Sequence, residues 1–235
     1  MRVLDFKILY AGGETVYVAS RSQAKAEAVI KTTTEASTSK NTSGKLKFLH
    51  LDPNDLLVVK AAAESFAQQE DKLDLGAAAV ASGVSGKTRV VWTSSALAES
   101  GSPINGINFD LEHLDPQSKF ARRYAKDGIV SVCLDPGFLN TAFFNGTPAA
   151  VMFVLNKVIL SDAIYGVYTE LYAGLSPGVT LEKSGSYIIP CGRIRPNEAT
   201  PRQGLIKTGD TKEEGGLDYG NKFWAWCEGK WRSYA

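Results

Sequence analysis

The chain has few of the residues that mark metal sites and disulfide frameworks. It contains three cysteines, Cys133, Cys191 and Cys227, and two histidines among its 235 residues. The cysteines are odd in number and widely spaced, which matches neither a set of disulfides nor the ligand spacing of a zinc site. We therefore expect no metal centre, and free thiols of this kind favour a reducing, cytoplasmic location.

An excess of charge and a long apolar run are also absent. The 26 basic and 25 acidic residues leave a net charge of +1, which gives no reason to expect a nucleic-acid partner. The opening residues are too polar for a signal peptide. The longest apolar stretch, 149–160, contains Asn156 and Lys157 and falls well short of the roughly 20 residues that cross a bilayer. We expect no membrane span and interpret this stretch as an amphipathic core helix.

Short β-branched and aromatic runs alternate with helical patterns along the chain. We expect strands at 15–19, 46–51, 89–93, 129–134 and, as the last one, 187–189. Helices are predicted at 22–30, from a turn at 52–55 to about 69, at 163–175, and in the tail that carries Phe223, Trp224 and Trp226. The polar segments 31–45 and 195–216 are interpreted as loops. The alternation predicts a single α/β domain over 1–235, with a mostly parallel sheet.

Three motifs follow one another along the chain. Ser94-Ser95 comes at the end of one predicted strand, Lys119 follows it, and Asp135-Pro136-Gly137 comes at the end of the next predicted strand, with Thr141 four residues on. With the segments TVYVASRS (15–22), KFLHLDPNDL (47–56) and FARRYAKDGIVSVCLDP (120–136), they resemble the fungal, retinol-dehydrogenase-like branch of the short-chain dehydrogenase/reductase family. The resemblance implies a Rossmann-like, doubly wound sheet. It also implies NADP-dependent hydride transfer on a small carbonyl or alcohol. The family holds its substrate largely with the segment after Thr141, whose apolar residues at 142–160 favour an apolar substrate, although buried packing explains them as well.

The resemblance assigns catalytic roles to Ser95 and Lys119. Ser95 would hydrogen-bond the substrate carbonyl, with Ser94 one residue away as an alternative register. Lys119 would hold the cofactor ribose and lower the pKa of a catalytic tyrosine. Each residue also has a simpler interpretation, as a serine that caps a turn and as a lysine on a helix surface.

Cofactor contacts are implied at five further positions. Arg21, after the strand at 15–19, suits the 2′-phosphate of NADP, and Asp52 resembles the acid that contacts adenine. Arg21 could equally be a helix-entry residue without a ligand, and Asp52 a helix cap. Pro136, Gly137 and Thr141 resemble the Pro-Gly-x-x-x-Thr segment that lies against the nicotinamide.

The chain departs from the family pattern at three places. The printed residues begin within what should be the first helix, so the first strand and its glycine-rich phosphate turn are not seen; Gly12-Gly13 follows that helix and reads as its C-cap. The central strand ending in Asn-Asn-Ala-Gly is missing after residue 75. Asp115 occupies the position four residues before Lys119, where the family has its tyrosine.

These departures predict an incomplete Rossmann-like sheet and leave two functional interpretations open. One is an NADP-dependent oxidoreductase. The other is a catalytically inactive homologue with at most a binding or dimer-partner role. The shortened helix that should carry the catalytic pair is one that relatives use for dimerisation, so a homodimer is a further expectation.

Overall fold

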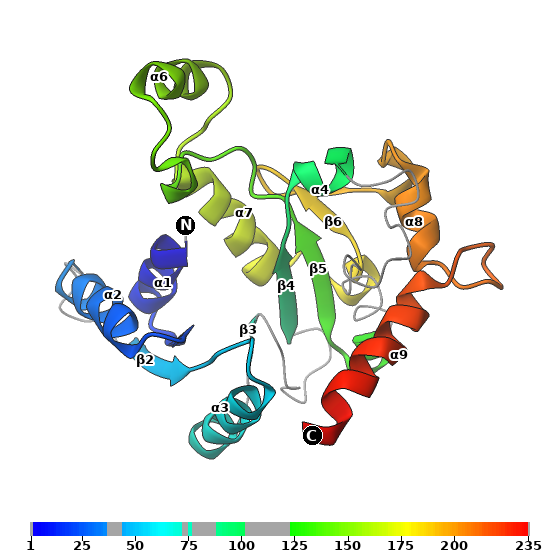
Figure 1. The fold of residues 1–235 in the computed structure, drawn as a ribbon, viewed down its shortest axis with the longest axis horizontal. Helices are drawn as coiled ribbons and strands as arrows, with labels where there is room; N and C mark the ends of the chain where they lie inside the picture. The colour runs from blue at the N-terminus through cyan, green and yellow to red at the C-terminus, as the bar shows by residue number, and fades with distance from the viewer. Residues whose placement is uncertain (1, 37–43, 72–74, 77–87, 102–122, 235) are drawn as a thin grey trace. The chain divides into compact units, whose positions relative to one another are not determined.

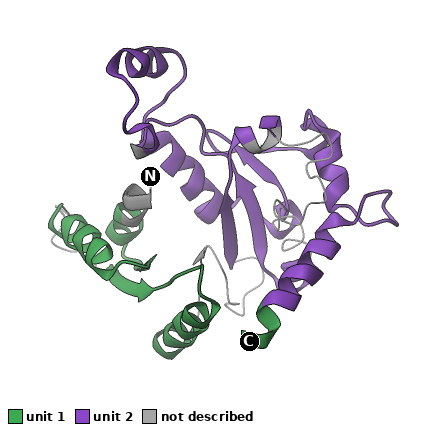
Figure 2. Cartoon of the chain, in the orientation of Figure 1, with its two compact units in different colours: residues 1–71, 231–235 green, residues 72–230 purple. Residues whose placement is uncertain are grey.

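The computed structural model describes residues 2–36, 44–71, 75–76, 88–101 and 123–234. The chain divides into two compact units, residues 1–71 with 231–235 and residues 72–230, called unit 1 and unit 2 below (Figure 2). The expected single domain over 1–235 stays a prediction.

Unit 1 is built on two parallel strands with helices on both faces. Its elements are α1 (Arg2–Ala11), β1 (Thr15–Ser20), α2 (Gln23–Ala36), β2 (Lys45–His50), α3 (Leu56–Gln69) and the short η5 (Arg232–Tyr234). β1 and β2 pair in register from Thr15 opposite Lys45 to Ser20 opposite His50. Val16 and Val18 are buried on one face of the pair, whereas Tyr17 lies on the other face, where its ring meets Phe66 of α3.

Three helix ends in unit 1 bear on the sequence predictions. Gly13 has a φ of 94°, in agreement with a glycine C-cap after α1. α3 begins at Leu56, with Asp55 as its N-cap. The prediction of a loop from residue 31 is wrong, because α2 continues to Ala36. The hydroxyls of Thr32 and Thr34 donate to backbone carbonyls one turn earlier in the helix, at 2.7 and 2.8 Å, which accommodates these β-branched residues in it.

Unit 2 holds a five-stranded sheet in the order β3-β4-β5-β6-β7 (Figure 1). Neighbouring strands are parallel except for the antiparallel pair β6 and β7. The core packs residues of β5, β6, α7 and the turn after α7 together: Val130, Val132, Leu134, Ala173, Val179 and Ile188. The strands are β3 (Leu75–Gly76), β4 (Arg89–Thr93), β5 (Val130–Leu134), β6 (Tyr187–Ile189) and β7 (Arg193–Arg195). The helices are α4 (Ala96–Gly101), α6 (Ala149–Val158), α7 (Ala163–Leu175), α8 (Gln203–Gly209) and α9 (Tyr219–Trp231), with 3-10 turns η1 (Ala125–Asp127), η2 (Ala142–Phe144), η3 (Leu181–Lys183) and η4 (Asn197–Ala199).

The α/β class and the mostly parallel, partial Rossmann-like sheet are confirmed. The strand expected to be missing after residue 75 is represented, in the described residues, by the two residues of β3. The described strands form two separate sheets, β1-β2 and β3 to β7, so the described residues do not form one continuous doubly wound sheet.

Three predictions for unit 2 are wrong. The strand at 187–189 is not the last, because Cys191 and Gly192, at φ values of 67° and 69°, reverse the chain into β7, and η4 and α8 occupy the predicted loop. α6 is not a core helix: none of its residues is buried, and Phe153 and Val158 are 63% and 74% exposed. Figure 1 shows α6 standing apart from the other helices of its unit. No described helix is long and apolar enough to cross a membrane.

Candidate functional site

The carboxyl edge of the unit 2 sheet brings two predicted motifs together. Thr93 at the end of β4 lies opposite Leu134 at the end of β5, and the Ser94 N–H donates to the Leu134 carbonyl at 2.7 Å. The N–H of Asp135, the residue after β5, donates to the Ile188 carbonyl of β6 at 2.8 Å. Ser94-Ser95 and Asp135-Pro136-Gly137 therefore leave the sheet from adjacent strands, at the edge where open α/β sheets bind ligands.

Gly137 has a backbone conformation that other residues rarely adopt. Its φ is 92°, and a Cβ placed on it would lie 3.2 Å from Cγ of Pro190. Its N–H donates to Oδ1 of the buried Asp135 at 2.9 Å, which holds the turn after β5 in place. The family resemblance explains this glycine by the close approach of the nicotinamide. The described contacts explain it by the backbone conformation of the turn.

The hydroxyls of Ser95 and Thr141 both make local hydrogen bonds. Ser95 Oγ accepts from the Leu97 N–H at 3.2 Å at the start of α4, and Thr141 Oγ1 accepts from the Phe143 N–H at 3.4 Å in η2. For Ser95 this is the turn-capping role that the simpler interpretation assigned to it. Each bond uses an acceptor lone pair of the hydroxyl, so the hydroxyl proton is still available to a ligand.

Arg21 and Asp52 lie together at the carboxyl edge of the other sheet, in unit 1. They follow Ser20 and His50, which are opposite each other, and the Leu51 N–H donates to the Ser20 carbonyl at 3.2 Å. The Arg21 side chain is exposed, while Asp52 Oδ1 accepts from the Asn54 N–H at 3.0 Å and closes a turn. The predicted cofactor contacts are thus divided between the two units.

The remaining catalytic positions, Lys119 and Asp115, lie outside the described residues. The structure therefore brings Ser95, Pro136 and Gly137 to one sheet edge and Arg21 and Asp52 to another. Among the described residues, no group of three or more histidine, cysteine or acidic side chains could hold a metal ion.

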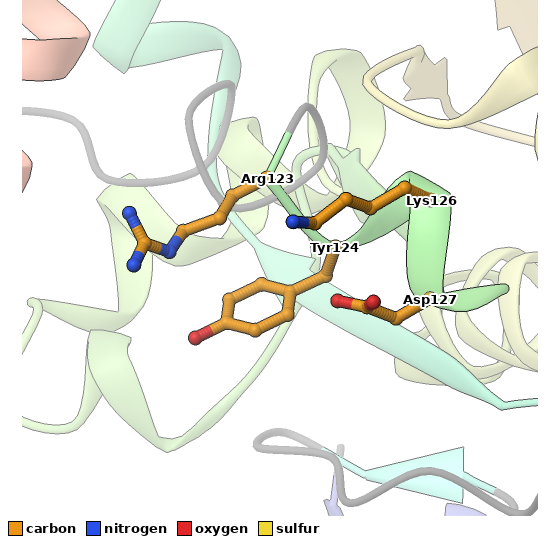
Figure 3. A pocket seen from close by; sticks show the side chains of 4 residues that line it. All are labelled: Arg123, Tyr124, Lys126 and Asp127. Carbon is orange, nitrogen blue, oxygen red and sulfur yellow. The ribbon is translucent and has the colours of Figure 1, made fainter.

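A hollow of about 540 Å³ that the sequence patterns did not indicate is lined by Arg123, Tyr124, Lys126 and Asp127 (Figure 3). It borders the aromatic tail: the Arg123 guanidinium lies 4.9 Å from the centre of the Trp224 ring, and the Tyr124 ring meets Trp224 edge-on at 5.9 Å. None of the predicted site residues in the described ranges lines it. Through these contacts with Trp224, Arg123 and Tyr124 help to dock α9 on unit 2.

Unit 1 contains a hydrogen-bonded tyrosine–lysine pair that no sequence motif indicated. Lys47 Nζ donates to the Tyr17 hydroxyl at 3.0 Å and to Glu70 Oε1 at 2.6 Å, and the Tyr17 hydroxyl donates to Glu70 Oε1 at 2.7 Å. Desolvation raises the pKa of Tyr17 despite the opposing effect of Lys47. A phenol that is harder to ionise is a poor proton relay near neutral pH, so this cluster joins β1, β2 and the end of α3 as a structural contact.

Comparison with known proteins shows where the chain belongs. No family model matches it. The short-chain dehydrogenase/reductase iacJ of Pestalotiopsis fici is 33% identical, over 97% of this chain and 85% of the relative. The short-chain dehydrogenase/reductase bet4 of Neocamarosporium betae is 29% identical, over 94% and 80%.

Solved structures share the fold at low identity. The L-sorbose reductase of Gluconobacter frateurii, complexed with NADPH and L-sorbose, has a TM-score of 0.54 at 12% identity and covers 80% of this chain and 90% of its own. The NADPH-bound carbonyl reductase from chicken fatty liver has a TM-score of 0.56 at 15% identity, with 82% and 93% covered.

The alignment with iacJ is longer than this chain. It spans 285 positions and uses 97% of 235 residues, about 228, so about 57 aligned positions have no residue in this chain. With one relative 33% identical over nearly the whole chain, and with the fold shared by solved reductases, this chain belongs to the short-chain dehydrogenase/reductase family.

Proposed function

We propose that the activity in this chain's lineage is NADP-dependent hydride transfer on a small, apolar carbonyl or alcohol. The chain is an oxidoreductase-family member, and two similar structures carry NADPH by name. The exposed guanidinium of Arg21 directly after β1 supports NADP rather than NAD, since it can pair with a 2′-phosphate. Apolar side chains in the segment after Thr141, such as the 88% exposed Phe143, support an apolar substrate.

Each end of the cofactor has candidate residues in this chain. Arg21 and Asp52 would hold the adenosine part, and Gly137 with Thr141 would lie against the nicotinamide, which supplies the hydride when bound. The positive φ of Gly137 keeps a side chain out of that turn, so the backbone can approach a flat ring closely. Ser95 keeps a proton with which to hydrogen-bond a substrate carbonyl.

Gly12-Gly13 and Asp115 do not fit NADP-dependent hydride transfer. Gly12-Gly13 ends α1 instead of opening a helix, so it cannot direct helix N–H groups at a diphosphate. Asp115 stands where a phenol should donate a proton, and an aspartate with an ordinary pKa of about 4 is already ionised near neutral pH.

We therefore favour the second candidate for this polypeptide: a non-catalytic member of the family, with at most a binding or dimer-partner role. The observation that carries this choice is Asp115 in the tyrosine position. The local hydrogen bonds of Ser95, Asp52 and Thr141 agree with it, because they give these side chains structural roles that need no ligand.

The test measures oxidation of NADPH in the presence of small apolar aldehydes and ketones. The readout is the loss of the absorbance of the reduced nicotinamide. We expect no turnover from the full chain, from Asp115→Tyr, or from the charge-removing control Asp115→Asn, while chicken carbonyl reductase validates the assay. Turnover by the unmodified chain would restore the first candidate. Turnover gained only by Asp115→Tyr would show that the cofactor site is intact and that the phenol alone is missing.

A further inference from the structure

Asn145 and Gly146 occupy the two central positions of a tight turn between η2 and α6. The Thr147 N–H donates to the Phe144 carbonyl at 3.0 Å, which closes the turn. Gly146 has a φ of 96°, the positive value that the third residue of a type II turn requires. The turn does not use the Gly146 N–H, and among the described residues no acceptor binds that N–H.

The side chain of Asn145 is not held in place either. Asn145 is exposed, and in the part of the chain that the structure describes its amide makes no hydrogen bond. A Cβ placed on Gly146 would meet no atom within 4 Å, so packing does not crowd the turn. The amide carbon of Asn145 and the backbone nitrogen of Gly146 are therefore free to approach each other.

We propose that Asn145 is a site of spontaneous deamidation. The Gly146 nitrogen attacks Cγ of Asn145 and forms a C–N bond, and the bond between Cγ and Nδ2 breaks. The proton of the Gly146 N–H passes through solvent to the departing nitrogen, which leaves as ammonia. Water then opens the five-membered succinimide at either carbonyl, which gives aspartate or isoaspartate. Asparagine is a chemically labile residue, and glycine favours ring closure because it has no Cβ to crowd the ring.

Other residue pairs of unit 2 lack this combination of features. Asn140 Nδ2 donates to Asn156 Oδ1 at 2.9 Å, and Asn156 lies within α6, where the following N–H is bonded to a carbonyl one turn earlier. Asp127 precedes a glycine, Gly128, but this glycine is buried and its N–H donates to a backbone carbonyl at 3.0 Å. The exposed turn at Asn145 leaves both reacting groups unpaired, which these pairs do not.

Deamidation changes the charge of the segment after Thr141. Residues 142–160 contain one charged side chain, Lys157, and no acidic one. A carboxylate at position 145 is ionised near neutral pH and lies four residues before Ala149, the first residue of α6. The product therefore introduces the first negative charge of this segment, close to the start of α6. This consequence holds whether or not the chain binds a cofactor.

The first test incubates the full chain in neutral buffer and follows its peptide map by mass spectrometry. We expect aspartate and isoaspartate to accumulate at position 145 about tenfold or more faster than at Asn140 or Asn156, because an unpaired N–H and a missing Cβ both favour ring closure. The other Asn-Gly pair of the sequence, Asn105-Gly106, lies outside the described residues and is mapped separately. Equal rates at positions 140, 145 and 156, or aspartate without isoaspartate, would overturn the proposal.

The second test compares the folded turn with a synthetic peptide of residues 139–151. We expect the full chain to deamidate within about tenfold of the peptide rate, because local opening of this exposed turn costs little. Gly146→Ala should slow the reaction about tenfold or more in the peptide, where folding plays no part, and also in the full chain. Asn145→Gln should stay intact, because its longer side chain closes a less favourable ring. A full chain that stays intact while the peptide deamidates would refute the proposal.

Discussion

Replacing Gly137 with alanine perturbs the turn that presents the predicted nicotinamide contact. At a φ of 92°, an added Cβ would lie 3.2 Å from Cγ and 3.5 Å from Cβ of Pro190. A non-glycine residue in the left-handed region costs about 1–2 kcal/mol. A contact tighter than ordinary van der Waals distance against a stiff proline ring adds up to about 1 kcal/mol. We expect Gly137→Ala to lower the free energy of unfolding by about 2 kcal/mol.

A second glycine of the same unit separates these two costs. Gly146 has a φ of 96°, but a Cβ there would meet no atom within 4 Å. Gly146→Ala should therefore carry the backbone cost alone and destabilise less than Gly137→Ala. The double variant Gly137→Ala/Pro190→Ala should recover part of the difference, because the crowded ring is removed.

Equilibrium urea unfolding, followed by circular dichroism, measures all four variants, the fourth being Pro190→Ala as the reference for the cycle. The reasoning is refuted if Gly137→Ala is as stable as the unmodified chain, or no less stable than Gly146→Ala. A variant as stable as the unmodified chain would mean that neither the backbone conformation nor Pro190 requires glycine, which would leave close approach of a ligand as the reason for it. A loss no larger than that of Gly146→Ala would mean that Pro190 adds nothing to the backbone cost.

Two further predictions concern an ion pair and a helix cap. Hydrogen bonds from Lys47 and Tyr17 lower the pKa of Glu70, so its carboxylate stabilises the fold above the ordinary glutamate pKa, and that stabilisation is lost as pH falls through the lowered value. In the unmodified chain the urea midpoint should fall as the pH becomes acidic, and Glu70→Gln should make this fall less steep. Glu64→Gln, at an exposed position, should leave the pH dependence of the midpoint unchanged. The same pH dependence in both variants would contradict the prediction. Asp162→Ala should cost about 1 kcal/mol in urea unfolding, because Asp162 Oδ1 accepts from the Ile164 N–H at 2.9 Å at the start of α7. Asp162→Asn should retain most of that stability, and a matching loss would argue against the cap.

The elements with strong local signals could be predicted from the sequence. α7 begins and ends where expected, at Ala163 and Leu175, because Asp162 caps it and Pro177 cannot continue it. The strand β4 was predicted over its full length because its residues form an apolar, β-branched run. Such signals depend only on neighbouring residues, which is why they can be read without a structure.

Predictions that depend on distant contacts failed or could not be made. The apolar composition of α6 is typical of a core helix, but burial depends on what packs against it, and its residues are exposed. β7 exists because Ile194 pairs with Ile188, and its three residues are too short to give a pattern. At the candidate site, the sequence predicted that Ser95 and Gly137 each follow a strand. It could not show that these two strands are neighbours or that Gly137 contacts Pro190.

The proposal that this family member is non-catalytic, with a Gly12-Gly13 pair that ends α1 and cannot hold a cofactor diphosphate, is tested most directly by the melting temperature of the full chain with and without NADPH. A ligand at about 100 times its dissociation constant adds roughly 2.7 kcal/mol. For a domain of this size that corresponds to a rise of about 5–11 °C. We predict no rise at millimolar NADPH, with chicken carbonyl reductase as the binding control. A rise in this range would contradict the account and show that the chain still holds its cofactor.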